Sequence, residues 1–222
     1  MQIQPLFTLL TGLAQHNERP WFQDHKAEYD HLRADFEQDV DFWLQGLAAL
    51  DPALAGRDAR RSIFRIYRDV RFSKNKDPYK VHFSAYFTAG PSKDIDTAGY
   101  YVQLGPNGQT LVAGGLYQPG KTQLAALRQE IDYNAAELRA ILAAPDFQRY
   151  FPSLGGETLK KVPAGYDPAH PDLDLLRHKS FVAAHEMPDA EVLAHPDFRA
   201  HVLAAFRALV PLCQFLRTAV QA

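Results

Sequence analysis

The sequence predicts an α+β fold, with an antiparallel sheet of about four or five strands packed by a long N-terminal helix and by C-terminal helices. Apolar residues recur at helical spacing before residue 50, alternate with polar residues between 60 and 118, and return to helical spacing after 119. The length of 222 residues suits one domain, 1–222, with a helical part (1–50), a sheet-forming part (60–118) and a mainly helical and loop part (119–222).

The first part is expected to hold two helices. Leu6, Phe7, Leu10 and Leu13 place one apolar face on residues 4–15. Asn17 is a candidate cap, and Pro20 suits the first turn of a second, long helix over 21–50.

The middle part changes to a two-residue period, which is typical of half-buried strands. Asn107-Gly108 lies between two such runs, and both residues tolerate the positive φ of a type I′ hairpin turn. Gly114-Gly115 inside a strand pattern indicates a bulge or a close backbone approach. The expected strands cover 63–72, 81–88, 100–104 and 111–117.

The last part returns to helices. We expect one over 122–131, a second that Asn134 caps and that runs to 143, and a third over 197–219 that Pro211 kinks or splits. Residues 151–180 are expected to be loops with one short strand near 158–162. The lone Cys213 lies on an apolar helical stripe and is expected in the core.

Composition narrows the class of protein. The residues are 46% apolar and 23% charged, which is typical of a globular protein, and the net charge of −2 favours no particular partner. One cysteine makes no internal disulfide, and neither a signal peptide nor a membrane-spanning run is apparent. These observations favour a cytoplasmic protein without a membrane partner.

Positive charge is concentrated in one segment. Nine Lys or Arg and three Asp lie between Arg57 and Lys80, so this segment carries +6 and the remainder carries −8. Such asymmetry focuses a field on one surface, although charge runs are also commonly solvated or paired internally.

The second half of this segment is the predicted anion site. The turn-rich stretch Ser73–Pro78 can bring nearby cations together, and Arg and Lys both bind phosphate. Arg68 is in phase with apolar positions, so we expect a structural ion pair of Arg68 and Asp69 instead. The predicted ligand-binding residues are Arg71, Lys74, Lys76 and Lys80, with Arg65, Tyr79 and His82 as neighbours.

The string Arg68–Lys80 (RDVRFSKNKDPYK) resembles the signature of an uncharacterised family, domain of unknown function 2461. The resemblance covers nearly the whole chain and supports a single α+β domain, and it assigns no activity, substrate or cofactor. Its other segments are Asn17–Phe22, Gly99–Leu104, Gly114–Pro119, Leu127–Ile131, Lys161–Tyr166 and His178–Phe181.

The sequence contains no recognisable motif for several kinds of chemistry. The nine histidines show no tight metal-ligand spacing, and neither a nucleophile elbow nor a phosphate-binding glycine loop occurs. The best hypothesis is binding of a phosphorylated small molecule, a nucleotide or nucleic acid at residues 71–80. Two alternatives stay open: a protein–protein interaction or scaffold domain with a structural ion-pair network, and a hydrolase-like enzyme with an unrecognised pocket. A nucleic-acid site predicts an open basic stripe, and an enzyme predicts a pocket holding a residue of shifted pKa.

Overall fold

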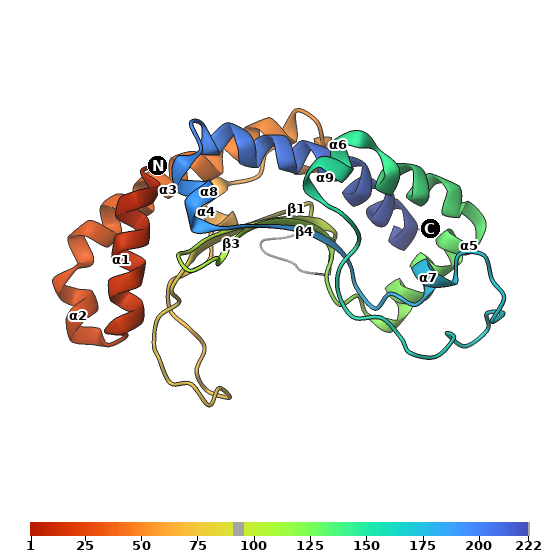
Figure 1. Ribbon diagram of the computed structural model, residues 1–222, viewed down its shortest axis with the longest axis horizontal. Coiled ribbons are helices and arrows are strands. Elements are labelled where there is room, and N and C mark those ends of the chain that lie inside the picture. Colours follow the sequence, from red (N-terminus) through yellow and green to blue (C-terminus); the bar gives the residue numbers. More distant parts are fainter. Residues whose placement is uncertain (91–95, 222) are drawn as a thin grey trace. The chain divides into compact units, whose positions relative to one another are not determined.

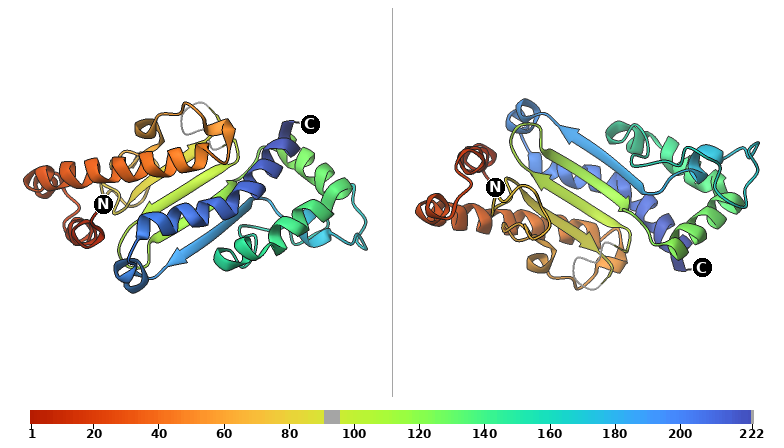
Figure 2. Two further views of the ribbon diagram at one scale, coloured as in Figure 1. Left: turned by 90° about the horizontal axis from the view of Figure 1, so that it is seen from above. Right: turned by 90° about the horizontal axis from the view of Figure 1, so that it is seen from below.

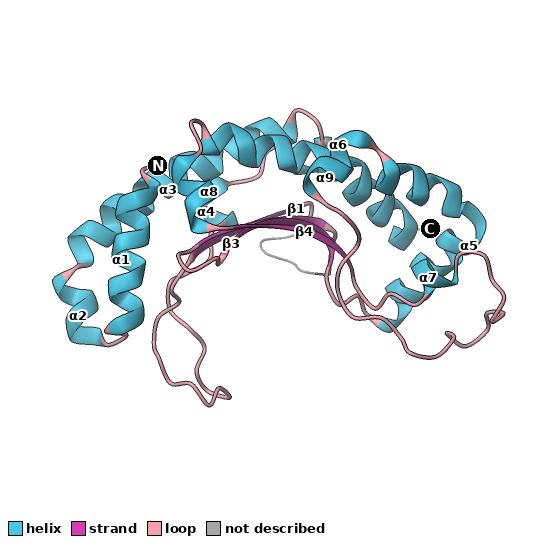
Figure 3. Ribbon diagram, in the orientation of Figure 1, coloured by secondary structure: helices cyan, strands magenta, loops and turns pink. Residues whose placement is uncertain are grey.

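Helices and one antiparallel sheet make up the computed structural model, which describes residues 1–90 and 96–221 (Figures 1 and 3). The α+β class is therefore confirmed. The chain forms two compact units, and each is described by itself. Unit 1 comprises residues 1–87, 101–112 and 186–203, and unit 2 comprises residues 88–100, 113–185 and the chain from 204 onward.

The strands of the sheet follow one another in space in the order β1-β2-β3-β4. Asn107 and Gly108 have φ values of 62° and 71°, as the predicted type I′ turn between β2 and β3 requires. β4 falls where only loop and helix were expected. The strands are β1 (Phe83–Thr88), β2 (Gly99–Leu104), β3 (Thr110–Leu116) and β4 (Phe181–Met187).

Two predicted strands are wrong as regular strands. Residues 63–72 make only isolated bridges, Ile63 with Ala85 and Tyr67 with Tyr79. Residues 158–162 make one isolated bridge, from Thr158 to His178. Apolar and polar residues alternate in these segments, but no neighbouring strand pairs with them continuously. Without such pairing they do not form regular strands.

Unit 1 opens with three helices that follow the predicted apolar stripes. The helix expected over 21–50 is interrupted at His25, whose φ and ψ are −103° and 10°. The Trp21 ring stacks on the His25 ring at 3.8 Å, and both pack at this break. The helices of unit 1 are α1 (Ile3–Gln15), α2 (Arg19–Asp24), α3 (Lys26–Ala48), α4 (Ala59–Ser62) and α8 (Asp189–Ala194), with a 3₁₀ turn at Pro52–Leu54.

The core of unit 1 lies between α3 and β1, which run beside each other (Figure 2). Phe36 and Tyr29 of α3 contact Phe83 of β1, with ring centroids 5.5 and 5.6 Å apart. Trp43 is fully buried, and its indole N–H donates to the Arg199 carbonyl at 2.9 Å. Aromatic burial therefore fixes α3 on the sheet.

Unit 2 contains α5 (Lys121–Ala143), α6 (Pro145–Tyr150), α7 (Leu173–Leu176) and most of α9 (Phe198–Gln221). Asn134, expected as a cap between two helices, has the non-helical φ of −130° inside α5, so the helical run is kinked there. Pro211 was expected to kink or split the last helix, and α9 extends through it as one helix. Cys213 is buried, as predicted, and its Sγ lies 3.4 Å from the Gly99 carbonyl oxygen.

By length and composition α9 also resembles a membrane span, contrary to the expectation that the chain has no membrane-spanning run. Of its most apolar window, 72% is buried inside the protein, as in the core helix of a globular fold.

Candidate functional site

A long irregular hairpin, residues 64–82, joins α4 to β1 and contains the predicted anion site (Figure 1). We call it the basic arm. Its two sides are joined by backbone hydrogen bonds from Arg68 N–H to the Pro78 carbonyl (2.9 Å) and from Lys80 N–H to the Ile66 carbonyl (2.8 Å). The chain thus folds back on itself, as the turn-rich sequence predicts.

The root of the arm is held by Asn17. Its side-chain amide donates to the Tyr79 carbonyl and accepts from the Tyr79 N–H, both at 3.0 Å. The Tyr79 ring is 2% exposed and stacks on Phe22 at 4.2 Å. Tyr79 was predicted beside a ligand, and the structure instead buries it as the anchor of the arm. Asn17, expected as a helix cap, serves this anchor.

The tip of the arm carries a local ion pair and an exposed ring. The Arg71 guanidinium donates to the Asp69 carboxylate at 2.6 Å and lies 5.7 Å from the centre of the Phe72 ring. Phe72 is 94% exposed. Hydrogen bonds from Arg71 lower the pKa of the Asp69 carboxyl to about 2.

Arg68 and Asp69 do not form the expected ion pair, and each has another partner. Arg68 donates to the Asp77 carbonyl at 3.0 Å and to the Ser73 hydroxyl at 3.4 Å, while Asp69 accepts from Arg71. Arg68 therefore braces the inside of the arm. Its structural role agrees with the sequence, but the partner does not.

The remaining cations of the predicted site lie along the arm. The Lys76 ammonium donates to the Val70 carbonyl at 3.0 Å, and the Lys80 ammonium lies 5.0 Å from the centre of the Phe64 ring. Arg65 and Lys74 are exposed. Within the described part of the chain, the side chains of Arg65, Lys74 and Lys76 form no ion pair.

His82 lies where the arm enters β1 and is only partly exposed. Burial, and secondarily the charge of Lys80, lowers its pKa to about 4. The imidazole is therefore neutral at neutral pH. A neutral ring offers an anion one hydrogen bond but no charge.

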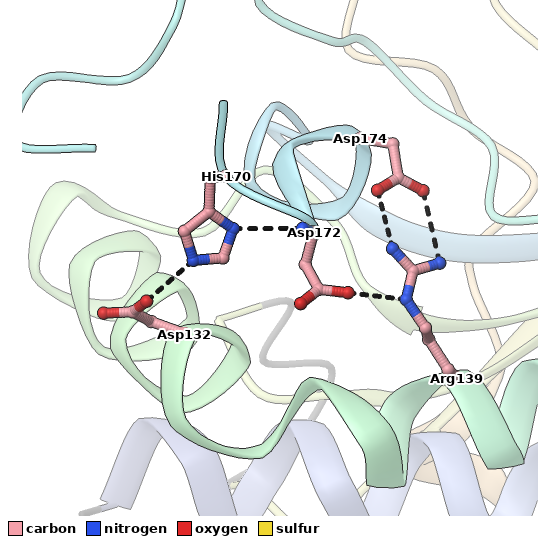
Figure 4. A network of polar contacts seen from close by, with 5 residues as sticks. All are labelled: Asp132, Arg139, His170, Asp172 and Asp174. Carbon is pink, nitrogen blue, oxygen red and sulfur yellow. Dashed lines mark hydrogen bonds and ion pairs between the residues drawn. The ribbon is translucent and has the colours of Figure 1, made fainter. Parts of the chain in front are cut away.

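A second polar cluster lies in unit 2, between α5 and the loop that leads into α7 (Figure 4). Arg139 donates to the carboxylates of Asp172 at 2.6 Å and Asp174 at 2.8 Å. His170 Nε2 lies 2.9 Å from Asp132, and its Nδ1 accepts from the Asp172 N–H at 3.0 Å. These contacts tie residues 170–174 to α5.

This network does not have the geometry of a general base. Because Nδ1 of His170 accepts a backbone N–H, the ring proton belongs on Nε2, where it is donated to Asp132. Both ring nitrogens are thus engaged, which leaves neither free to take a proton from another group. The partners are 33 to 38 residues apart in sequence, so no local motif signals the network.

Comparison with protein-family models identifies a family for this chain. The model of a family described as "Conserved hypothetical protein (DUF2461)" matches residues 5–215. No curated protein and no solved structure matches the chain significantly.

Proposed function

The chain belongs to the DUF2461 family of conserved hypothetical proteins, and we propose that in this member the basic arm binds nucleic acid, most directly a single strand. One observation carries the proposal. The arm carries three exposed cations that form no ion pair in the described structure: Arg65, Lys74 and Lys76. The almost fully exposed Phe72 lies on the same hairpin.

The chemistry of single-stranded nucleic acid matches this combination. Its phosphates form a row of negative charges, and its unstacked bases offer flat faces to aromatic side chains. The arm presents charge and an aromatic ring on an open surface, whereas a small phosphorylated ligand is usually enclosed by a pocket. Arg71 is positioned by Asp69 and lies against Phe72, as for a contact with a base stacked on that ring.

Fluorescence anisotropy with a labelled oligothymidylate tests the proposal. The log of the affinity should fall linearly with the log of the salt concentration, by about 0.7 per neutralised phosphate. A variant with Arg65, Lys74 and Lys76 changed to Gln should bind at least about tenfold more weakly and with a shallower slope. Phe72→Ala should weaken binding by about 1 kcal/mol or more without changing the slope.

A matched control distinguishes the effect of the arm's cations on binding from the effect of the protein's net charge. Lys121, Lys160 and Lys161 are exposed in unit 2, and changing them to Gln removes the same three charges. This variant should bind like the wild type. Equal weakening by both triple variants, or affinity that does not depend on salt, would contradict the proposal.

The ion pair of Arg71 and Asp69 favours a second candidate, a protein–protein contact through the tip of the arm. The mutually paired charges of Arg71 and Asp69 beside the exposed Phe72 suit an apolar partner surface. In that case Phe72→Ala abolishes capture of the partner, while the triple Gln variant leaves it intact and no oligonucleotide binds.

A further inference from the structure

A cavity of about 550 Å³ lies in unit 2, between α5, α6 and the part of α9 after residue 203. Its volume is in the range of small-molecule sites. Ile141 and Phe147 supply apolar side chains, and Ala208 and Pro211 supply them from α9. Figure 1 shows these three helices close together.

Four exposed charged side chains line the same cavity: Glu137, Asp146, Arg149 and Arg207. Within the described part of the chain, none of the four forms an ion pair. Arg149 lies 5.5 Å from the centre of the Tyr150 ring, which also lines the cavity. Two guanidinium groups and two carboxylates around an apolar floor are complementary to a ligand that carries one charge of each sign.

Pro211 interrupts the backbone hydrogen bonding of α9 beside the cavity. Proline has no N–H, so the Arg207 carbonyl, four residues earlier in α9, lacks its usual intrahelical donor. Both residues line the cavity.

The cavity also continues along the helices. A second hollow of about 250 Å³ shares Glu137, Ile141 and Pro211 with it and extends to Phe215 and Thr218. An elongated ligand therefore fits better than a single amino acid. Phosphate-rich ligands fit poorly, because Glu130, Glu137 and Asp146 offset the two guanidinium groups, which leaves no net positive charge along the two hollows.

We infer that this cavity, the α5–α9 groove, binds a short apolar peptide with a free amino and a free carboxyl end. Arg149 and Arg207 hold the carboxylate, because guanidinium matches its geometry. Glu137 and Asp146 hold the ammonium, and the apolar floor receives the side chains.

Isothermal titration calorimetry with the dipeptide Leu-Leu tests the inference. We expect saturable binding that weakens by about tenfold or more in Arg207→Gln and in Glu137→Gln, since each loses a hydrogen bond to a charged group. The blocked peptide N-acetyl-Leu-Leu-amide should bind at least about tenfold more weakly than Leu-Leu. Lys121→Gln, an exposed change on α5 outside the groove, should bind Leu-Leu like the wild type.

Because the four charged side chains are exposed, these variants should fold, which circular dichroism can verify. No saturable heat with Leu-Leu up to about 5 mM, a concentration that detects even millimolar affinity, would overturn the inference. Equal binding of the blocked peptide, or unchanged affinity in both Gln variants, would do the same. The basic arm has no part in this measurement.

Discussion

At the scale of single residues, Asp69 and Arg71 show how a short-range contact tunes an exposed group. The pKa of the Asp69 carboxyl falls from 3.8 to about 2. Because the folded value is the lower one, the stabilisation is present above pH 3.8 and is lost as the pH falls towards 2. Exposed pairs add little to the free energy of unfolding, so the effect of this pair is to orient the tip of the arm.

Changing Arg71 to Gln should return the pKa of Asp69 towards 3.8, because the largest cause of its depression is removed. Nuclear magnetic resonance titration of the side-chain carboxyl carbon measures this directly. Arg65→Gln is the control, since Arg65 is the weakest of the contributors. A larger shift from the Arg65 change would show that the paired geometry is wrong.

His82 should make stability depend on pH in a mildly acidic range. Its folded pKa of about 4 lies below the ordinary 6.5, so the unfolded chain binds more protons between these values. Stability is therefore full above pH 6.5 and falls as the pH drops towards 4. Urea unfolding should lose about 2 kcal/mol between pH 7 and pH 5 from this group.

The variant His82→Gln should lose about 2 kcal/mol less of its free energy of unfolding between pH 7 and pH 5 than the wild type. His31 is exposed on α3, and His31→Gln should retain it. The same pH dependence in wild type and His82→Gln would contradict the buried, neutral state of this ring.

At the scale of elements, the basic arm depends on the Asn17 side chain, which makes the backbone hydrogen bonds that a neighbouring strand would otherwise make. Asn17 satisfies both backbone groups of the buried Tyr79. Asn17→Ala should leave both without partners and destabilise the protein by about 1–3 kcal/mol, measured by urea unfolding. Asn17→Asp retains the acceptor but sets an oxygen against the Tyr79 carbonyl, so it should also destabilise the protein. An alanine variant as stable as the wild type would show that water replaces the amide without cost.

Gly115 of β3 lies against Phe181 of β4, at a φ of 128°. A Cβ there would lie 2.0 Å from the Phe181 carbonyl oxygen. Gly115→Ala should destabilise the protein by about 3 kcal/mol or more, which thermal unfolding can measure. Gly56→Ala has positive φ and open space, so it should cost only about 1 kcal/mol. Similar losses in both would exclude the close approach.

The sequence predicted the elements whose signal is local and missed those that depend on distant partners. The Asn107-Gly108 turn and the close approach at Gly114-Gly115 were confirmed because glycine and asparagine report backbone conformation directly. β4 was missed because Phe181–Met187 lacks clear alternation: its burial depends on what covers each residue. In the basic arm, the charges were visible in sequence. The anchoring of Tyr79 by Asn17, 62 residues away, was not.

At the scale of the whole molecule, the chain passes between the two units within all four strands, β1 to β4, and within α9. The single domain predicted from the sequence therefore has a direct test. Both tryptophans, Trp21 and Trp43, lie in unit 1, and the buried Cys213 lies in unit 2. We expect urea transitions followed by tryptophan fluorescence and by thiol labelling to share one midpoint, since shared strands and a shared helix cannot be lost separately. Two separate midpoints would show independent domains.

The contrast between the buried root of the basic arm and its exposed tip has a consequence for how this protein can diversify. Tyr79 and Asn17 supply the anchoring, whereas the side chains from Arg71 to Lys76 face mainly solvent. Recognition loops on rigid scaffolds vary in sequence because other residues hold the fold. The tip can therefore acquire new specificities by substitution or insertion without loss of folding, which makes it a natural position for grafting a foreign loop.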